Sequence, residues 1–395
     1  MRLFILLQNL ANGLTQPFMG FLAVVSGVSG GGLGVVSSAT SFFTGVSQLA
    51  VSLRVRDVFK LFLWSMVVLS MLWTTMAFIS YGNPLLYIVN YVLIAFFNGI
   101  IALSWSLILE RVSRGSRGRI LAEFGFYGSI GSLLATIVAG FIVGDRYWLA
   151  KWVFLTASIL LMLNLANVVS IVREVDDAPA TYSGAQGVKY VLANVSGMRG
   201  FLTATFLFAV VWAFAWPIFP LAQYYVLQMN LEQVAIVSVI SGVSTLVLQK
   251  PIGVLVDKNR RIMLFLGRFL LLTFPLAYAL ATNVYEIYLA NIVAGVTNSI
   301  SNTAYIAYVF DNSQDKRTAI GLYNAIYGSG TLIGSVVGGF MVNALEPVLG
   351  VNESIRLLLF CDAAARALIS VMYLKVPETG IASRGALATV SRHGH

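Results

Sequence analysis

The sequence is poor in charged residues, which make up only 10% of its 395 residues. A water-soluble protein carries about a quarter charged residues, because its surface must remain solvated. This chain has too little charge to cover a soluble fold of its size. The shortage excludes an ordinary soluble protein and indicates that lipid is the solvent for most of the chain.

Cysteine and histidine are also scarce. The only cysteine, Cys361, excludes an internal disulfide, and the two histidines, His393 and His395, fall within the last three residues. Their absence elsewhere disfavours a His-ligated metal site, a Ser-His catalytic triad and a histidine proton relay. There is also no phosphate-binding Gly-x-x-x-x-Gly-Lys-Ser/Thr loop, so a nucleotide-driven pump is disfavoured. We expect no catalytic residue, no metal and no cofactor.

Long apolar runs dominate what is present, since 58% of the residues are hydrophobic and the mean hydropathy is +0.84. A membrane-spanning helix needs roughly 20 apolar residues. On that rule the sequence predicts an all-α membrane protein with twelve transmembrane helices. The predicted spans are 3–25, 33–53, 60–80, 84–109, 119–143, 148–171, 200–227, 232–255, 262–281, 285–309, 318–343 and 355–375.

The basic residues lie mainly in short clusters between these spans rather than on one stripe. Most of the 25 Lys and Arg residues fall on one side of the predicted membrane, whereas Arg146 and Lys151 fall on the other. Positive loops mark the cytoplasmic side. We therefore expect a multi-pass protein of the cell membrane with both termini in the cytoplasm. The net charge of +9 is explained without binding to nucleic acid.

The two halves resemble each other at an offset close to 200 residues, which favours a parallel repeat. The matched positions are Pro17 and Pro217, Asp57 and Asp257, Asn98 and Asn298, and Tyr127 and Tyr327. We expect two pseudo-symmetric six-helix bundles, at 1–171 and 200–376. A polar cytoplasmic linker at 172–199 joins them, and a cytoplasmic tail follows at 377–395.

One segment carries a family signature. The run Gly253-Val254-Leu255-Val256-Asp257-Lys258-Asn259-Arg260-Arg261 resembles the Gly-x-Leu-x-Asp-Arg/Lys loop of the major facilitator superfamily, and Asp57 begins a degraded copy in the first half. The resemblance covers the whole chain. It implies a monomeric secondary active transporter that works by alternating access, with a conformational latch at this loop. The latch candidates are Asp57, Gly253, Asp257, Lys258 and Arg261.

Two departures from the family pattern bear on coupling. In the fourth helix of the family an arginine stands three residues before a Gln-Gly pair, and this sequence has Ala95 at the arginine position. The fifth span lacks the Gly-Pro signature of many drug/proton antiporters in the family. Both departures weaken the interpretation as a proton-coupled drug exporter. A facilitative uniporter and a non-transporting membrane receptor or sensor on the same fold remain alternatives. A membrane-embedded enzyme is disfavoured by the missing histidines.

The resemblance places the first, fourth, seventh and tenth helices along the central path, where polar residues recur at helical spacing. The candidate substrate-binding residues are Asn9, Asn12, Gln16, Asn98, Trp105, Tyr127, Trp212, Trp216, Asn298, Asn302, Tyr305, Tyr323 and Tyr327. Amides with aromatic rings suit a small uncharged or amphipathic organic solute. No Lys or Arg lies deep in those four helices, which disfavours an anionic substrate. Hydrogen bonding between helices is the alternative role of the amides.

Few ionisable residues lie within the spans, and such residues are functional candidates. Glu123 and Asp362 are the candidates for ion coupling, with H⁺ as the ion. Asp362 and Arg366 are spaced to pair at i, i+4, and a purely structural pair is the favoured alternative there. Arg268, in the peripheral ninth helix, is interpreted as structural or as reaching toward the lipid headgroups.

Overall fold

The structure is a computed structural model that describes residues 1–54, 58–112, 117–175, 198–312 and 316–377. Over these ranges the chain forms helices and no strand. Its elements group into two compact units, residues 1–185 with 228–239 and residues 186–227 with 240–395. Much of the predicted linker and nearly all of the predicted tail lie outside the described residues, so the predicted domain boundaries stay a prediction.

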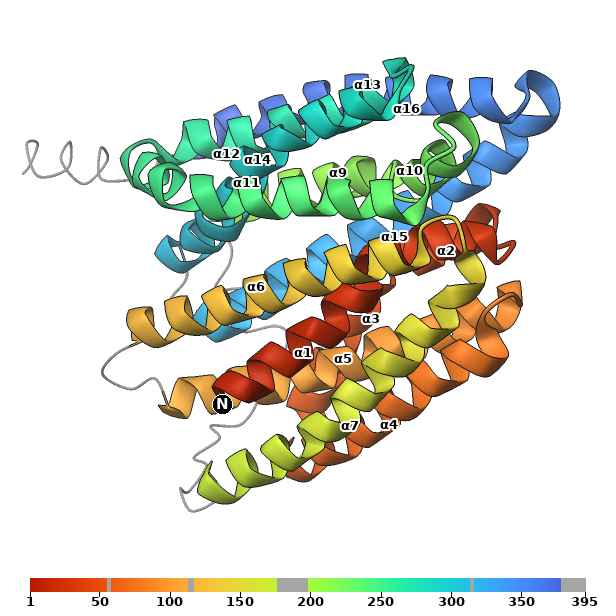
Figure 1. Ribbon diagram of the computed structural model, residues 1–395. Helices are drawn as coiled ribbons and strands as arrows, with labels where there is room; N and C mark the ends of the chain where they lie inside the picture. Colours follow the sequence, from red (N-terminus) through yellow and green to blue (C-terminus); the bar gives the residue numbers. More distant parts are fainter. Residues whose placement is uncertain (55–57, 113–116, 176–197, 313–315, 378–395) are drawn as a thin grey trace, which may run out of the picture. The chain divides into compact units, whose positions relative to one another are not determined.

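The first unit contains the elements up to α7 (Figure 1). They are α1 (Arg2–Thr15), η1 (Gln16–Phe18), α2 (Met19–Val25), α3 (Gly30–Arg54), α4 (Val58–Thr75), η2 (Met76–Ser80), α5 (Pro84–Val112), α6 (Arg117–Val143), η3 (Tyr147–Leu149) and α7 (Ala150–Val175). Helix α1 packs along both α6 and α7, while α3 and α4 pack against α5.

The second unit is built mainly from the elements that follow. They are α9 (Arg199–Phe214), α10 (Ile218–Leu221), η5 (Ala222–Val226), α11 (Leu231–Lys258), α12 (Arg260–Phe269), η6 (Leu270–Leu272), α13 (Thr273–Leu280), α14 (Val284–Asp311), α15 (Lys316–Leu349), α16 (Val351–Ser370) and η7 (Val371–Lys375). Helix α9 packs along α15, and α16 packs against α9, α13 and α15. The start of α11 belongs to the first unit, where the Leu231 N–H donates to the Gly144 carbonyl.

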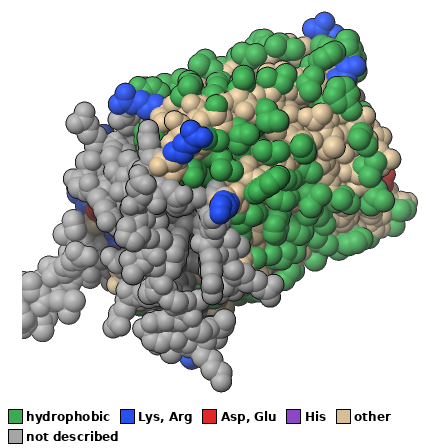
Figure 2. Space-filling view, turned by 90° about the horizontal axis from the view of Figure 1, so that it is seen from below, with side chains coloured by type: hydrophobic (Ala, Val, Ile, Leu, Met, Phe, Trp, Pro, Cys, Tyr) green, Lys and Arg blue, Asp and Glu red, His purple; other side chains and the backbone are tan. Residues whose placement is uncertain are grey.

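Each of the twelve predicted spans overlaps a helical stretch. Nine of these stretches, among the described residues, are long and apolar enough to cross a membrane. The other three overlap 3–25, 33–53 and 285–309, which contain amides or runs of glycine and serine. Figure 2 shows hydrophobic side chains spread over one face, with Lys and Arg at its margins. The all-α membrane fold is confirmed, and the count of twelve spans stays a prediction.

Prolines interrupt several of the long helices. A proline has no N–H, so the carbonyl four residues earlier loses its helical partner. The first and seventh stretches break at Pro17 and Pro217. Pro17 frees the Gly13 carbonyl, which accepts a hydrogen bond of 2.9 Å from the Thr136 hydroxyl on α6. A neighbouring helix therefore supplies the partner that the proline removes.

Close helix crossings through glycine recur in both units. A Cβ at Gly13 of α1 would clash with the Ser132 carbonyl of α6, and one at Gly334 of α15 would clash with the Val210 carbonyl of α9. Likewise, Gly99 packs on α3 and Gly295 packs on α11. Small residues allow such approach within a membrane. Corresponding helix pairs thus pack alike in the two halves, which supports the predicted repeat.

Candidate functional site

Two amides of the first helical stretch contact neighbouring helices. The Gln16 Oε1 atom accepts a hydrogen bond of 2.8 Å from the Tyr91 hydroxyl on α5. The Asn9 side chain donates to the Ile5 carbonyl and lies against Gly128 of α6. Both amides contribute to packing between helices, which is the alternative role that the sequence left open.

Asn12 and Asn98 differ from those two amides. Both are half-buried, and neither side chain has a hydrogen-bond partner among the described residues. An amide in an apolar setting costs free energy unless it is hydrogen-bonded. Among the predicted amides of the first unit, these two side chains are therefore the best placed to bind water or a solute.

The aromatic candidates of the first unit divide in the same way. The Trp105 ring lies 4.6 Å from the Phe4 ring and 5.9 Å from the Phe124 ring, measured between centroids. Trp105 therefore packs among other aromatic rings. Tyr127 is 36% exposed and its ring contacts Phe126, so Tyr127 is the more exposed of the two residues.

In the second unit, Asn298 faces α11. Its Nδ2 atom donates to the hydroxyls of Ser241 and Thr245, at 3.4 and 3.3 Å, and the residue remains exposed. The side chain of Asn302 lies outside the described part of the structure. Asn298 can thus exchange its two weak contacts for stronger ones with a solute.

The remaining aromatic candidates of the second unit form one cluster. The Trp212 ring lies 4.8 Å from the Trp216 ring and 5.8 Å from the Tyr327 ring, measured between centroids. The Tyr323 ring stacks on the Tyr327 ring with a centroid distance of 6.1 Å. Tyr305 is buried, and its hydroxyl donates to the Leu264 carbonyl at 2.7 Å. The structure therefore brings these five predicted residues together.

Arg268 lies in the middle of that aromatic cluster, which the sequence did not predict. Its guanidinium carbon is 4.0 Å from the centroid of Tyr305 and 4.7 Å from that of Phe208. The residue is only 3% exposed. Arg268 therefore does not reach toward the headgroups, and this part of its interpretation was wrong. The sequence gives the spacing of residues within α12 but not which helices surround it.

Asp362 and Arg366 form the predicted pair, with Arg366 Nε 2.7 Å from Asp362 Oδ2 and both side chains fully buried. The two remaining nitrogens of Arg366 donate to the carbonyls of Leu271 and Trp212, each at 2.8 Å. The Leu271 carbonyl is free because Pro275, four residues later, has no N–H. The Trp212 carbonyl is free because the Trp216 N–H bonds to Ala213 instead.

Arg366 thus joins α16 to two interrupted helices and supplies hydrogen bonds that those interruptions remove. A guanidinium can make all three contacts at once because its donors form a planar fork. This geometry supports the structural interpretation of the pair over a role for Asp362 in ion coupling.

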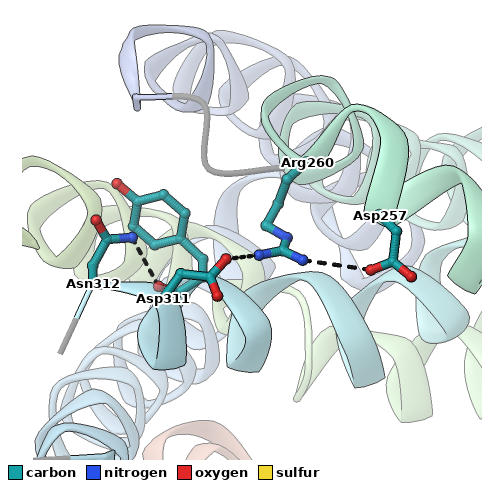
Figure 3. Close-up of polar contacts among 5 residues, drawn as sticks. Asp257, Arg260, Asp311 and Asn312 are labelled. Carbon is teal, nitrogen blue, oxygen red and sulfur yellow. Dashed lines mark hydrogen bonds and ion pairs between the residues drawn. The ribbon is translucent and has the colours of Figure 1, made fainter. Parts of the chain in front are cut away.

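The loop signature forms a cluster of charges at three helix ends (Figure 3). Arg260, the first residue of α12, contacts Asp311 at the end of α14. It also lies 3.5 Å from Asp257 near the end of α11. Each charge stands at the end of its own helix where the helix dipole disfavours it. Mutual pairing therefore offsets these dipole penalties and links the three helix ends.

The residues that form this cluster differ from the predicted latch residues. Arg260 and Asp311 make the observed contacts, and neither was among the predicted residues. Asp257 is part of the cluster, Lys258 and Arg261 are exposed, and a Cβ at Gly253 would meet nothing within 4 Å. Asp57 lies outside the described residues. Asp311 could not be found from the signature because it is distant in sequence.

Comparisons with known proteins agree with this architecture. Residues 201–387 match the model of the Major Facilitator Superfamily. The fold is similar to the crystal structure of nucleoside transporter NupG, with a TM-score of 0.73 and 14% identity over 95% of this chain and 97% of that one. Residues 201–387 therefore match the Major Facilitator Superfamily by sequence, and the fold of the chain agrees with that match.

Peptide transporters of solved structure share the superfamily fold with this chain. One peptide transporter POT, a variant in complex with alafosfalin, has a TM-score of 0.71 and 11% identity over 95% of this chain and 93% of that one. A bacterial homologue of the human drug peptide transporters PepT1 and PepT2 has a TM-score of 0.70 and 13% identity, over 95% and 96%. No curated protein matches the sequence. At these identities, the likeness shows the fold alone.

Two points remain, the position of Glu123 and the question of a metal site. Glu123 lies on α6, but its side chain is outside the described part of the structure. Among the described residues, no group of three His, Cys, Asp or Glu side chains could hold a metal ion.

Proposed function

We propose that this protein is a secondary transporter that moves a small amphipathic organic solute across the cell membrane by alternating access. The proposal is carried by polar groups with weak or no partners in each unit, together with half-buried aromatic rings in the second. Asn12 and Asn98 supply amides in the first unit. In the second unit Asn298 supplies an amide, and Trp212 and Tyr327 supply ring faces. Aromatic faces with a few polar groups are typical of sites that bind small organic molecules.

The cluster of Asp257, Arg260 and Asp311 supports the conformational part of the proposal. Exposed ion pairs contribute little stability, so the exposed carboxylate of Asp257 is poorly explained by folding alone. A contact that ties the ends of α11, α12 and α14 can favour one conformation and break in another. We propose that this cluster is the latch of the transport cycle, with Arg260 as its central residue.

Proton coupling is proposed through Glu123. Asp362 is held by Arg366, and the described part of the second unit contains no other buried carboxylate within a span. A carrier must change charge during the cycle, and an acid near a cytoplasmic helix end can do so. A protein that equilibrates its solute without pH dependence would instead be a facilitative uniporter.

The test begins with a thermal-shift screen of the purified protein against nucleosides, peptides, sugars and aromatic solutes. A ligand that binds the folded state raises its apparent stability, by about 2.7 kcal/mol at 100 times its Kd. Uptake of that ligand into proteoliposomes then separates a transporter from a receptor. We expect binding and flux together, and binding without flux would support the receptor alternative.

A further inference from the structure

Arg268 is the one buried arginine of the second unit's described residues that has no carboxylate near it. Arg366 pairs with Asp362, and Arg260 pairs with Asp257 and Asp311. The groups around Arg268 are instead aromatic rings and tyrosine hydroxyls. These groups are neutral, so one positive charge within the bundle remains without a counter-charge.

An unbalanced buried charge is costly, and within a membrane it marks a functional site by default. Ring faces offset part of this cost through cation–π contacts. The hydroxyls of Tyr323 and Tyr327 interact with the guanidinium as well. The Nε–H of Arg268, however, is buried and has no hydrogen-bond acceptor. The site thus retains both an unpaired donor and a full positive charge.

The aromatic residues around Arg268 differ in their exposure. Phe208, Tyr305 and Tyr373 are at most 1% exposed. Trp212 and Tyr327, which complete the cluster, are half-buried. These two residues are also candidates for binding the solute. A ligand that contacts them could extend a charged group toward the guanidinium.

We propose that the solute is a small monocarboxylate with an apolar body, and that Arg268 binds its carboxylate between the rings of α9, α14 and α15. A guanidinium matches a carboxylate in shape and offers two parallel donors. A single carboxylate balances the single charge of Arg268, whereas a phosphate dianion would leave a negative charge buried. The inference rests on the proposed transport function and defines its substrate class.

The test compares acids with their neutral amides in purified protein. The probes are phenylacetate, hexanoate and lactate, the corresponding amides, and phenylphosphonate as the dianion. We expect at least one carboxylate to raise the melting temperature while its amide does not. A panel in which no carboxylate binds, or in which the amide or the phosphonate binds as tightly, contradicts the proposal.

Variants then locate the binding group. Arg268→Gln should weaken carboxylate binding about tenfold or more, since a charge-assisted hydrogen bond is lost. The matched control is Arg356→Gln, because Arg356 donates to the carbonyls of Ala279 and Ala281 at the end of α13. An unchanged Kd in Arg268→Gln overturns the assignment. If that variant does not fold, the Kd for the carboxylate is measured in Arg268→Lys instead. Lysine keeps the charge but lacks the planar fork, so binding should again weaken.

Neutral nucleosides and peptides, tested beside the acids, separate this inference from the proposed function. Binding and flux of a neutral solute without any response to carboxylates would reject the inference and leave transport intact. Binding of a carboxylate at Arg268 without flux in proteoliposomes would support the inference and reject transport.

Discussion

At the scale of single residues, the arginines of the second unit show how a side chain substitutes for missing backbone hydrogen bonds. Arg366 donates to the Leu271 and Trp212 carbonyls, and Arg356 donates to carbonyls at the end of α13. Within a membrane no water is available to satisfy such carbonyls. The i, i+4 spacing predicted the pair of Asp362 and Arg366. It could not predict the two carbonyls, since they belong to other helices.

The substitution Arg366→Lys tests this role. A lysine keeps the charge but cannot reach Asp362 and both carbonyls together, so we expect a loss of about 3 kcal/mol in stability, as for other broken buried ion-pair networks. The measurement is thermal unfolding in detergent. Arg146→Lys is the control, because Arg146 is exposed and should change stability by less than about 0.5 kcal/mol. Equal melting temperatures for the two variants would contradict the role.

Glu123 is the residue that the coupling proposal tests. We expect Glu123→Gln to abolish solute accumulation driven by a pH gradient, because glutamine cannot release a proton. Exchange of solute at equal pH should continue, since it needs no net proton movement. The comparison is made in proteoliposomes with an imposed pH gradient. Accumulation that survives in Glu123→Gln removes this residue as the carrier, and a wild type without pH dependence indicates a uniporter.

At the scale of helices, the sequence predicts well where each helix lies along the chain, but it predicts poorly which helices pack against one another. All twelve apolar runs coincide with helical stretches, and the breaks at Pro17 and Pro217 follow from missing N–H groups. The aromatic cluster was predicted only as separate residues, because Arg268 at its centre comes from a helix expected to be peripheral. Tertiary packing decides which faces meet, and the pattern within one helix does not contain that information.

The cluster at the ends of α11, α12 and α14 gives a prediction at this scale. Asp257→Asn should change the transport rate and leave the melting temperature nearly unchanged. Asp257 is largely exposed, and such pairs contribute at most about 1 kcal/mol. Asp311→Asn should also lower stability, because Arg260 is buried and loses a close partner. The measurements are initial uptake rate and thermal unfolding.

The exposed carboxylate of Asp145 provides the control for the latch. Asp145→Asn should leave both rate and stability at wild-type values. The latch proposal is rejected by unchanged transport in Asp257→Asn and Asp311→Asn. It is equally rejected if the loss of stability in each variant accounts for its whole loss of transport.

At the scale of the whole molecule, composition and charge distribution predict the membrane fold and its orientation. The shortage of charge required lipid as the solvent, and the superfamily fold agrees with that requirement. The orientation rests on the distribution of basic residues among the loops. It is therefore a proposal with its own test.

Single cysteines test the orientation in intact cells, after the exposed Cys361 is replaced in Cys361→Ser. A cysteine at Lys258 should react with a membrane-impermeant thiol reagent only after the cells are opened, since Lys258 is expected to face the cytoplasm. A cysteine at Lys151 should react without opening. Reversed labelling of these two positions would overturn the orientation.

Counterflow in proteoliposomes tests the central claim of solute transport by alternating access most directly. Vesicles loaded with unlabelled ligand are diluted into a trace of labelled ligand at equal pH. A carrier that exposes its site to one side at a time exchanges the two, so alternating access predicts transient accumulation of label above its external concentration. Label that enters only to equilibrium would indicate a channel, and label that binds without entering would indicate a receptor. Either result would contradict the account.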